Sequence, residues 1–175
     1  MMNKNLLITI AIVFASNQFQ TTKADLSIVS YDVECPIADP EYFKDIEVYI
    51  ENEGRDNEFF INFTLIKILP ADAMITLKMI GASMGEFVVS TGIDFTVKAC
   101  SAVDEPIFGQ HIYRQLGINE EECPSPPGVY GGSHVNLVSL DTLPDTFPPN
   151  DYKITLTSQQ EDHIFYQCWT YFKIQ

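Results

Sequence analysis

Three histidines are the side chains in this sequence best suited to acid–base chemistry, and they stand singly at His111, His134 and His163. A nucleophilic enzyme needs a Ser or Cys beside a base, with a third group that orients the base. None of the three histidines belongs to a recognisable catalytic motif, so surface or packing roles are favoured. The sequence predicts a protein that is not an enzyme. The catalytic alternative is a lipid hydrolase, which would need a His within hydrogen-bond reach of a Ser or Asp in a cleft.

Four cysteines, Cys35, Cys100, Cys123 and Cys168, are the second group with specific chemistry. An even number of cysteines in an exported chain predicts two disulfides. Their spacing leaves three pairings open. A zinc site is disfavoured, because the sequence has no C-x-x-C motif and its histidines are isolated. No metal and no cofactor is predicted.

A run of acidic residues, Asn119-Glu120-Glu121-Glu122, raises the question of a calcium site. A calcium loop places its oxygens around one centre through an alternating D-x-[DN]-x-[DN]-G pattern. The run lacks that alternation, so we expect a solvated loop.

Asn62-Phe63-Thr64 is a sequon for N-glycosylation. Asn62 and Thr64 alternate with Phe59, Ile61 and Phe63, so they face away from that apolar row. A glycan on Asn62 is expected to project into water and to mask the outer face of its sheet.

Apolar side chains near the predicted loops and helix suggest a binding role, since the chain has 12 Phe, 8 Tyr and 5 Met. Plain core packing is one explanation. The other is that the sheets splay apart and enclose an apolar cavity, where soft Met and aromatic side chains suit an acyl chain or terpenoid. The residues predicted to line that cavity are Met79, Phe87, Phe95, Phe108, Ile112 and Leu116.

The elements that position these residues are expected to begin after a signal peptide over residues 1–24. Lys4 provides a basic start, Leu6–Ala15 an apolar segment, and Thr22-Lys23-Ala24 a cleavage site. The apolar segment is shorter than the roughly 20 residues that cross a bilayer. We therefore predict a secreted, extracellular protein with no stable membrane anchor.

The charge of the chain restricts its partners. Removing residues 1–24 takes away two lysines and no acidic residue, which changes the formal charge from −14 to −16. Nucleic acid and anionic headgroups would be repelled by this charge. No nucleic-acid partner is expected.

The rest of the chain alternates apolar and polar residues in short runs separated by Gly, Pro, Asn and Asp, which is typical of an antiparallel sheet protein. Asn57–Leu69 changes parity, and a bulge near Leu65 would reconcile its two halves. The predicted strands cover residues 29–35, 46–50, 57–69, 73–79, 86–90, 93–97, 129–140, 152–158 and 163–174.

Between Cys100 and Cys123 the period changes. Ile107, Phe108, Ile112 and Leu116 have helical spacing, which predicts a short amphipathic helix over Pro106–Gly117, ended by glycine. The predicted fold class is all-β: one domain over residues 25–175, a two-sheet antiparallel β-sandwich or β-cup of the ML or immunoglobulin-like kind, with one short helix in the Cys100–Cys123 loop.

An ordered series of residues carries a family resemblance. The series consists of Tyr31-Asp32-Val33-Glu34-Cys35, Cys123-Pro124, Gly128-Val129-Tyr130, Leu143-Pro144, Asn150-Asp151-Tyr152-Lys153-Ile154 and Cys168. With these residues the chain resembles the ganglioside-activator type of ML (lipid-recognition) domain, and the insect chemosensory CheB proteins and their secreted relatives. The similarity covers residues 120–175 and 28–50, and between them it is only architectural.

The resemblance implies that Cys35 pairs with Cys168 and Cys100 with Cys123. It also implies a cup with an apolar interior that binds lipid tails without catalysis. We therefore predict a carrier or presenter of a small hydrophobic ligand, such as a lipid, hydrocarbon or pheromone, in a chemosensory or lipid-handling context. The alternative is an extracellular interaction protein with a fully packed sandwich, whose loops bind a receptor or another extracellular protein.

Overall fold

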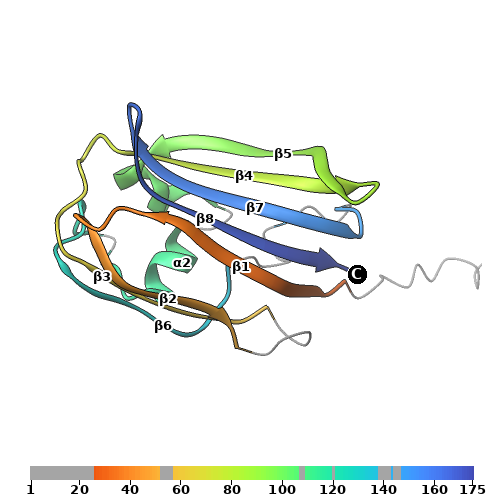
Figure 1. The fold of residues 1–175 in the computed structure, drawn as a ribbon, viewed down its shortest axis with the longest axis horizontal. Helices are drawn as coiled ribbons and strands as arrows, with labels where there is room; N and C mark the ends of the chain where they lie inside the picture. The colour runs from red at the N-terminus through yellow and green to blue at the C-terminus, as the bar shows by residue number, and fades with distance from the viewer. Residues whose placement is uncertain (1–25, 52–56, 107–108, 120, 138–142, 144–146) are drawn as a thin grey trace, which may run out of the picture.

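The computed structural model describes residues 26–51, 57–106, 109–119, 121–137, 143 and 147–175, and these residues form two facing layers of strands (Figure 1). The elements are β1 (Ile28–Ala38), β2 (Phe43–Ile50), β3 (Phe59–Leu65), β4 (Met74–Ser83), β5 (Glu86–Lys98), the 3₁₀-helix η1 (Ala99–Asp104), α2 (Gly109–Gln115), β6 (Gly128–Val135), β7 (Asn150–Gln160) and β8 (His163–Ile174). One sheet has the order β1-β8-β7-β4-β5 and the other β2-β3-β6, with all neighbours antiparallel. The predicted two-sheet antiparallel β-sandwich is confirmed.

Alternation along the strands fixes which side chains face the interior. In β4, Ile75, Leu77 and Met79 are buried, whereas Lys78 is exposed. Successive side chains of a strand point to opposite faces, so one buried row in each strand closes the space between the sheets. β8 has the bounds predicted from the sequence, and β7 extends slightly beyond its predicted range at both ends.

The β4–β5 hairpin turns at Met84 and Gly85, whose φ angles of 52° and 86° are both positive. This is the backbone of a two-residue type I′ turn, which suits the right-handed twist of the strands. β5 then runs unbroken from Glu86 to Lys98, where the sequence predicted two separate strands. Gly92 has a φ of 82°, and the register shifts opposite Met79, so a bulge carries the strand through the predicted break.

β3 ends earlier than the sequence predicts. The predicted strand reached Leu69 with a bulge near Leu65, but the ladder stops at Leu65. The Ile66 amide donates instead to the Tyr42 carbonyl at 2.7 Å. The chain leaves the sheet there, and Ile66 and Ile68 are exposed. The predicted bulge is therefore wrong.

Two groups of buried side chains pack near opposite ends of β8. Phe172 and Ile174 cluster with Met79 and Tyr152 at one end. Phe165 clusters with residues that include Phe43 and Leu65 at the other. Between these clusters, the inward side chains of β8 face the interior of the sandwich.

Candidate ligand-binding cavity

A cavity of about 260 Å³ lies between the two sheets. One water molecule occupies about 30 Å³ in the liquid, so the cavity has the volume of about nine waters. Pockets for small molecules begin at about 300 Å³, so this cavity lies just below the usual range. Its size suits a compact ligand.

Inward rows from both sheets form the walls. Tyr166, Cys168 and Thr170 contribute from β8, with Ile154 and Leu156 from β7. The smaller sheet contributes the side chains that alternate with its outward polar residues. These are Ile46 and Val48 of β2, Ile61, Phe63 and Leu65 of β3, and Tyr130 of β6.

The helix α2 lines the same space with Ile112, Tyr113 and the following Leu116. Its C-terminal half is held in place, because the Tyr113 hydroxyl donates to the Ala99 carbonyl at 3.2 Å and the Gly131 amide donates to the Leu116 carbonyl at 2.9 Å. A Cβ at Gly131 would overlap the carbonyl oxygen of Ile61, so only glycine allows this approach of β6 to β3. The helix lies over the cavity where the sequence predicted it.

The two disulfides have the pairing implied by the resemblance. Cys35 of β1 is bonded to Cys168 of β8, and Cys100 of η1 to Cys123 before β6. Three of these cysteines, Cys35, Cys123 and Cys168, also line the cavity. The first bond joins neighbouring strands across the cavity wall, and the second closes the segment that carries α2.

Part of the cavity lining on β1 and β2 is exposed to solvent. Two of its lining residues, Ile37 of β1 and Ile46 of β2, are 36% and 38% exposed. Each belongs to an edge strand of its sheet. An apolar molecule could therefore enter along this edge, on a path that does not require α2 to leave its place.

Of the six residues predicted to line a cavity, the structure brings together two. Ile112 and Leu116 line it. Met79 is buried in the cluster with Phe172, outside the cavity wall. Phe95 is also outside the wall, and it packs against the lining residues Ile75 and Leu77. Phe87 contacts Tyr171, with 5.3 Å between ring centroids, and is also outside the wall. Phe108 lies outside the described residues.

Most of the wall was missed by sequence reasoning, although a signal for it existed. Val33 with Cys35, Ile46 with Val48, and Ile61 with Phe63 each share a face in the predicted strands. Alternation identifies which face of a strand points inward, but not where along the strand the two sheets separate to leave a cavity. The lining residues therefore follow from the arrangement of the two sheets.

The tyrosine hydroxyls are among the few polar groups of the cavity wall. Tyr113 donates to Ala99, and Tyr130 donates to the Pro126 carbonyl at 2.6 Å. The Tyr166 hydroxyl makes no hydrogen bond to any described residue. Burial raises the pKa of Tyr166 well above its usual value, and the nearby Tyr113 adds to this effect. Tyr166 is therefore a neutral donor at every physiological pH.

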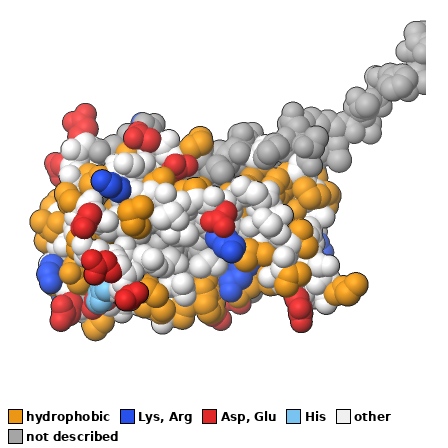
Figure 2. Space-filling view, turned by 90° about the horizontal axis from the view of Figure 1, so that it is seen from above, with side chains coloured by type: hydrophobic (Ala, Val, Ile, Leu, Met, Phe, Trp, Pro, Cys, Tyr) orange, Lys and Arg blue, Asp and Glu red, His pale blue; other side chains and the backbone are white. Residues whose placement is uncertain are grey.

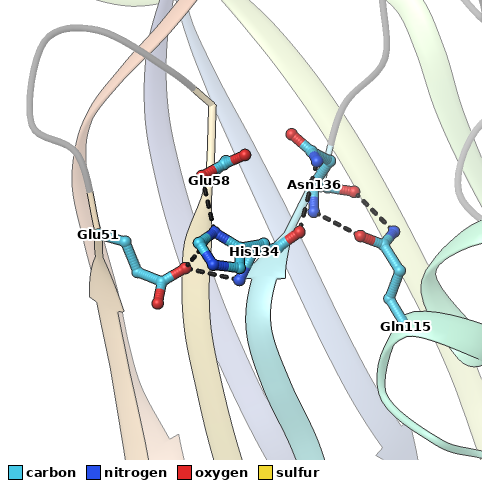
Figure 3. A network of polar contacts seen from close by, with 5 residues as sticks. All are labelled: Glu51, Glu58, Gln115, His134 and Asn136. Carbon is cyan, nitrogen blue, oxygen red and sulfur yellow. Dashed lines mark hydrogen bonds and ion pairs between the residues drawn. The ribbon is translucent and has the colours of Figure 1, made fainter.

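A second polar cluster lies outside the cavity, around His134 of β6 (Figure 3). The Nδ1 atom of His134 lies 2.9 Å from a Glu58 oxygen and 3.4 Å from a Glu51 oxygen. The His134 backbone amide also donates to Glu51. Beside it, the Asn136 amide donates to the Gln115 side chain at 2.8 Å, which ties β6 to α2.

The sequence predicted no metal site. The structure places one group of described residues with the composition to hold a cation, and this group consists of Glu51, Glu58 and His134. Their candidate ligand atoms lie within 4.8 Å of one another. Hydrogen bonds from the His134 ring and amide to the two carboxylates account for the arrangement by themselves. We assign this cluster a structural role that joins β6 to the β2–β3 hairpin.

Removing the charge of His134 is expected to change how stability depends on pH. The hydrogen bond to Glu58, with the negative charges of Glu51 and Glu58, raises the pKa of His134 above 6.5. This stabilisation is fully present below the unfolded pKa and is lost as pH rises through the higher folded pKa. Melting temperatures of the wild type and of His134→Gln should therefore differ more at about pH 6 than at about pH 9. An equal difference at both pH values, with His111→Gln as control, would contradict this.

The remaining histidines are not part of the cavity wall. His163 lies 2.7 Å from an Asp39 oxygen and packs against Phe165, and His111 is an exposed residue of α2. The expectation from the sequence that no G-x-S-x-G signature occurs is wrong, because Gly81-Ala82-Ser83-Met84-Gly85 has that pattern. Hydrolases place this motif at a strand-to-helix turn that exposes the nucleophile. Here it ends one strand of the β4–β5 hairpin, so it lacks the geometry of a nucleophile elbow.

Asn62 lies on the outer face of the smaller sheet, opposite the inward Ile61 and Phe63. Its side-chain amide donates a 3.4 Å hydrogen bond to the Asp45 carbonyl. We expect protein expressed through the secretory pathway of a eukaryotic cell to carry a glycan here, which would project from the face opposite the cavity. Treatment with peptide N-glycosidase should lower the mass of the wild type but not of Asn62→Gln. A wild-type mass that is the same before treatment as after it would refute the assignment.

The face seen in Figure 2 mixes hydrophobic, acidic, basic and uncharged side chains, without one large area of a single charge. Among the described residues, no helix has the length and apolar content to span a membrane. No family model matches the chain, and a search of curated proteins found no match to it. The resemblance to ML domains therefore stays a prediction from the sequence.

Proposed function

We propose that this protein is a secreted, non-catalytic carrier or presenter of a small hydrophobic ligand held between its two sheets. The observation that carries the proposal is the cavity of about 260 Å³ lined by inward rows of both sheets and by α2. A proposed ligand would be covered by the sandwich on two sides and by the helix on a third.

The cavity also supports this proposal over its main alternative. An interaction protein with a fully packed sandwich would hold no cavity larger than a few water volumes, because protein interiors pack as densely as organic crystals. The cavity has the volume of about nine waters. An empty apolar space of this size removes packing contacts from its lining residues, and a ligand would restore them.

Burial of apolar ligand surface would drive binding. Each 100 Å² of apolar surface removed from water contributes about 2.5 kcal/mol. The disulfides and the contacts of α2 hold the walls in place, so little ordering of the protein would oppose this gain. Export is supported by the two disulfides, which form in oxidising compartments.

Uptake of an apolar fluorophore tests the proposal. We expect 1-aminoanthracene to bind the delipidated protein at one site, with enhanced fluorescence, and to be displaced by a medium-chain hydrocarbon. Protein unfolded in guanidinium chloride is the control and should not enhance the fluorescence. If the folded protein gives no saturable signal and the hydrocarbon displaces nothing, the carrier function is wrong.

A further inference from the structure

The cavity wall contains no charged side chain among the described residues. Its members are aliphatic, aromatic, proline and cysteine residues, with a few hydroxyl groups. An ionised carboxylate or phosphate buried against such a wall would lose its hydration without gaining a partner of opposite charge, which is strongly unfavourable. The formal charge of −14 opposes the entry of an anion as well.

The Tyr166 hydroxyl in this wall is available to a ligand. Tyr166 lies on the inward row of β8, with its ring edge-on to Phe43 at 5.6 Å between centroids. The neighbouring tyrosines Tyr113 and Tyr130 already donate to backbone carbonyls. Tyr166 makes no hydrogen bond to the described residues, although buried tyrosine hydroxyls usually have a partner. A ligand oxygen that accepts a hydrogen bond would complete it.

Resting on the proposed carrier function, we propose that the ligand is an uncharged medium-chain molecule whose ester, aldehyde, ketone or alcohol oxygen accepts a hydrogen bond from Tyr166. The cavity volume of about 260 Å³ is small for a ligand pocket, which favours a medium-chain molecule over a long one. A fatty-acid anion of the same length could not place its carboxylate against this wall without losing hydration, so it should bind more weakly. Long two-chain lipids exceed the volume.

Displacement of 1-aminoanthracene by four nine-carbon compounds tests this assignment. The compounds are nonane, 1-nonanol, methyl octanoate and nonanoate at about pH 8, where the acid is ionised. We expect the alcohol and the ester to displace the probe at concentrations at least about tenfold below that of nonanoate, because the anion meets no counter-charge. Equal potency of nonanoate would overturn the uncharged ligand class.

Tyr166→Phe tests the hydrogen bond, since it removes one oxygen and keeps the ring. The substitution should weaken binding of the alcohol and the ester about three- to tenfold, as expected for one neutral hydrogen bond. Binding of nonane should be unchanged. Tyr49→Phe on the outer face is the matched control and should change none of the four. An equal loss of affinity for nonane, or no loss of affinity for any of the four compounds, would overturn the role of Tyr166. If the wild type takes up neither probe nor nonane, the carrier function itself has failed.

Discussion

Replacing Val33 and Val48 by tryptophan should weaken ligand binding about a hundredfold and leave the protein folded. The two valines face the cavity from opposite sheets. Their larger side chains would fill the space that a ligand occupies. Excluding about 110 Å² of ligand surface from burial at about 25 cal/mol per Å² removes about 3 kcal/mol, or about a hundredfold in affinity. Titration with 1-aminoanthracene measures this loss.

The thermal stability of the same variant separates a cavity from a packed core. Enlarging a side chain in a well-packed core destabilises by about 1–3 kcal/mol, whereas filling a cavity is often neutral or stabilising. We therefore expect the melting temperature of Val33→Trp/Val48→Trp to stay the same or rise. Glu34→Trp/Tyr49→Trp is the matched control, because these neighbours face outward and should not affect binding. Retained binding in the valine variant would place the ligand elsewhere.

Removing the Cys35–Cys168 disulfide should have the largest effect on stability. The bond closes a loop with a sequence separation of 133, and the chain-entropy relation assigns it about 5 kcal/mol. Domains of this size are usually stable by about 5–15 kcal/mol in total, so Cys35→Ser/Cys168→Ser should unfold far more readily. Equilibrium unfolding in urea measures the change.

The Cys100–Cys123 disulfide provides the comparison. Its sequence separation is 23, which corresponds to about 3 kcal/mol. Cys100→Ser/Cys123→Ser should therefore remain folded under conditions that unfold the first variant. It should also release ligand faster, because the bond closes the segment that carries α2 over the cavity. A larger loss of stability for this pair than for Cys35–Cys168 would contradict the account.

The outcome for β8 and β5 shows what the sequence could predict about the fold. β8 has clear local bounds, because Glu161 and Asp162 form a two-residue turn and alternation continues from there to Ile174. β5 was divided at Gly92, since glycine usually weakens a strand. The structure keeps the strand whole because glycine adopts a positive φ in a bulge and the ladder with β4 resumes beyond it.

The candidate site was harder to predict for a related reason. Ile112 and Leu116 were found because a short helix exposes one apolar stripe to whatever it covers. Met79 shares its strand face with Leu77 but lies further along β4, where it packs in a cluster with Tyr152 and Phe172. Tyr166 was missed because its proposed role depends on hydrogen bonds that the neighbouring hydroxyls of Tyr113 and Tyr130 already make. Such facts follow only from three-dimensional contacts.

Native mass spectrometry of the protein isolated from its own source tests the central claim most directly. The account predicts a one-to-one complex whose added mass is lost on gentle activation, and an uncharged medium-chain compound in the organic extract of the same sample. A bare protein mass, together with failure of the ligand-free protein to take up 1-aminoanthracene or nonane, would contradict it.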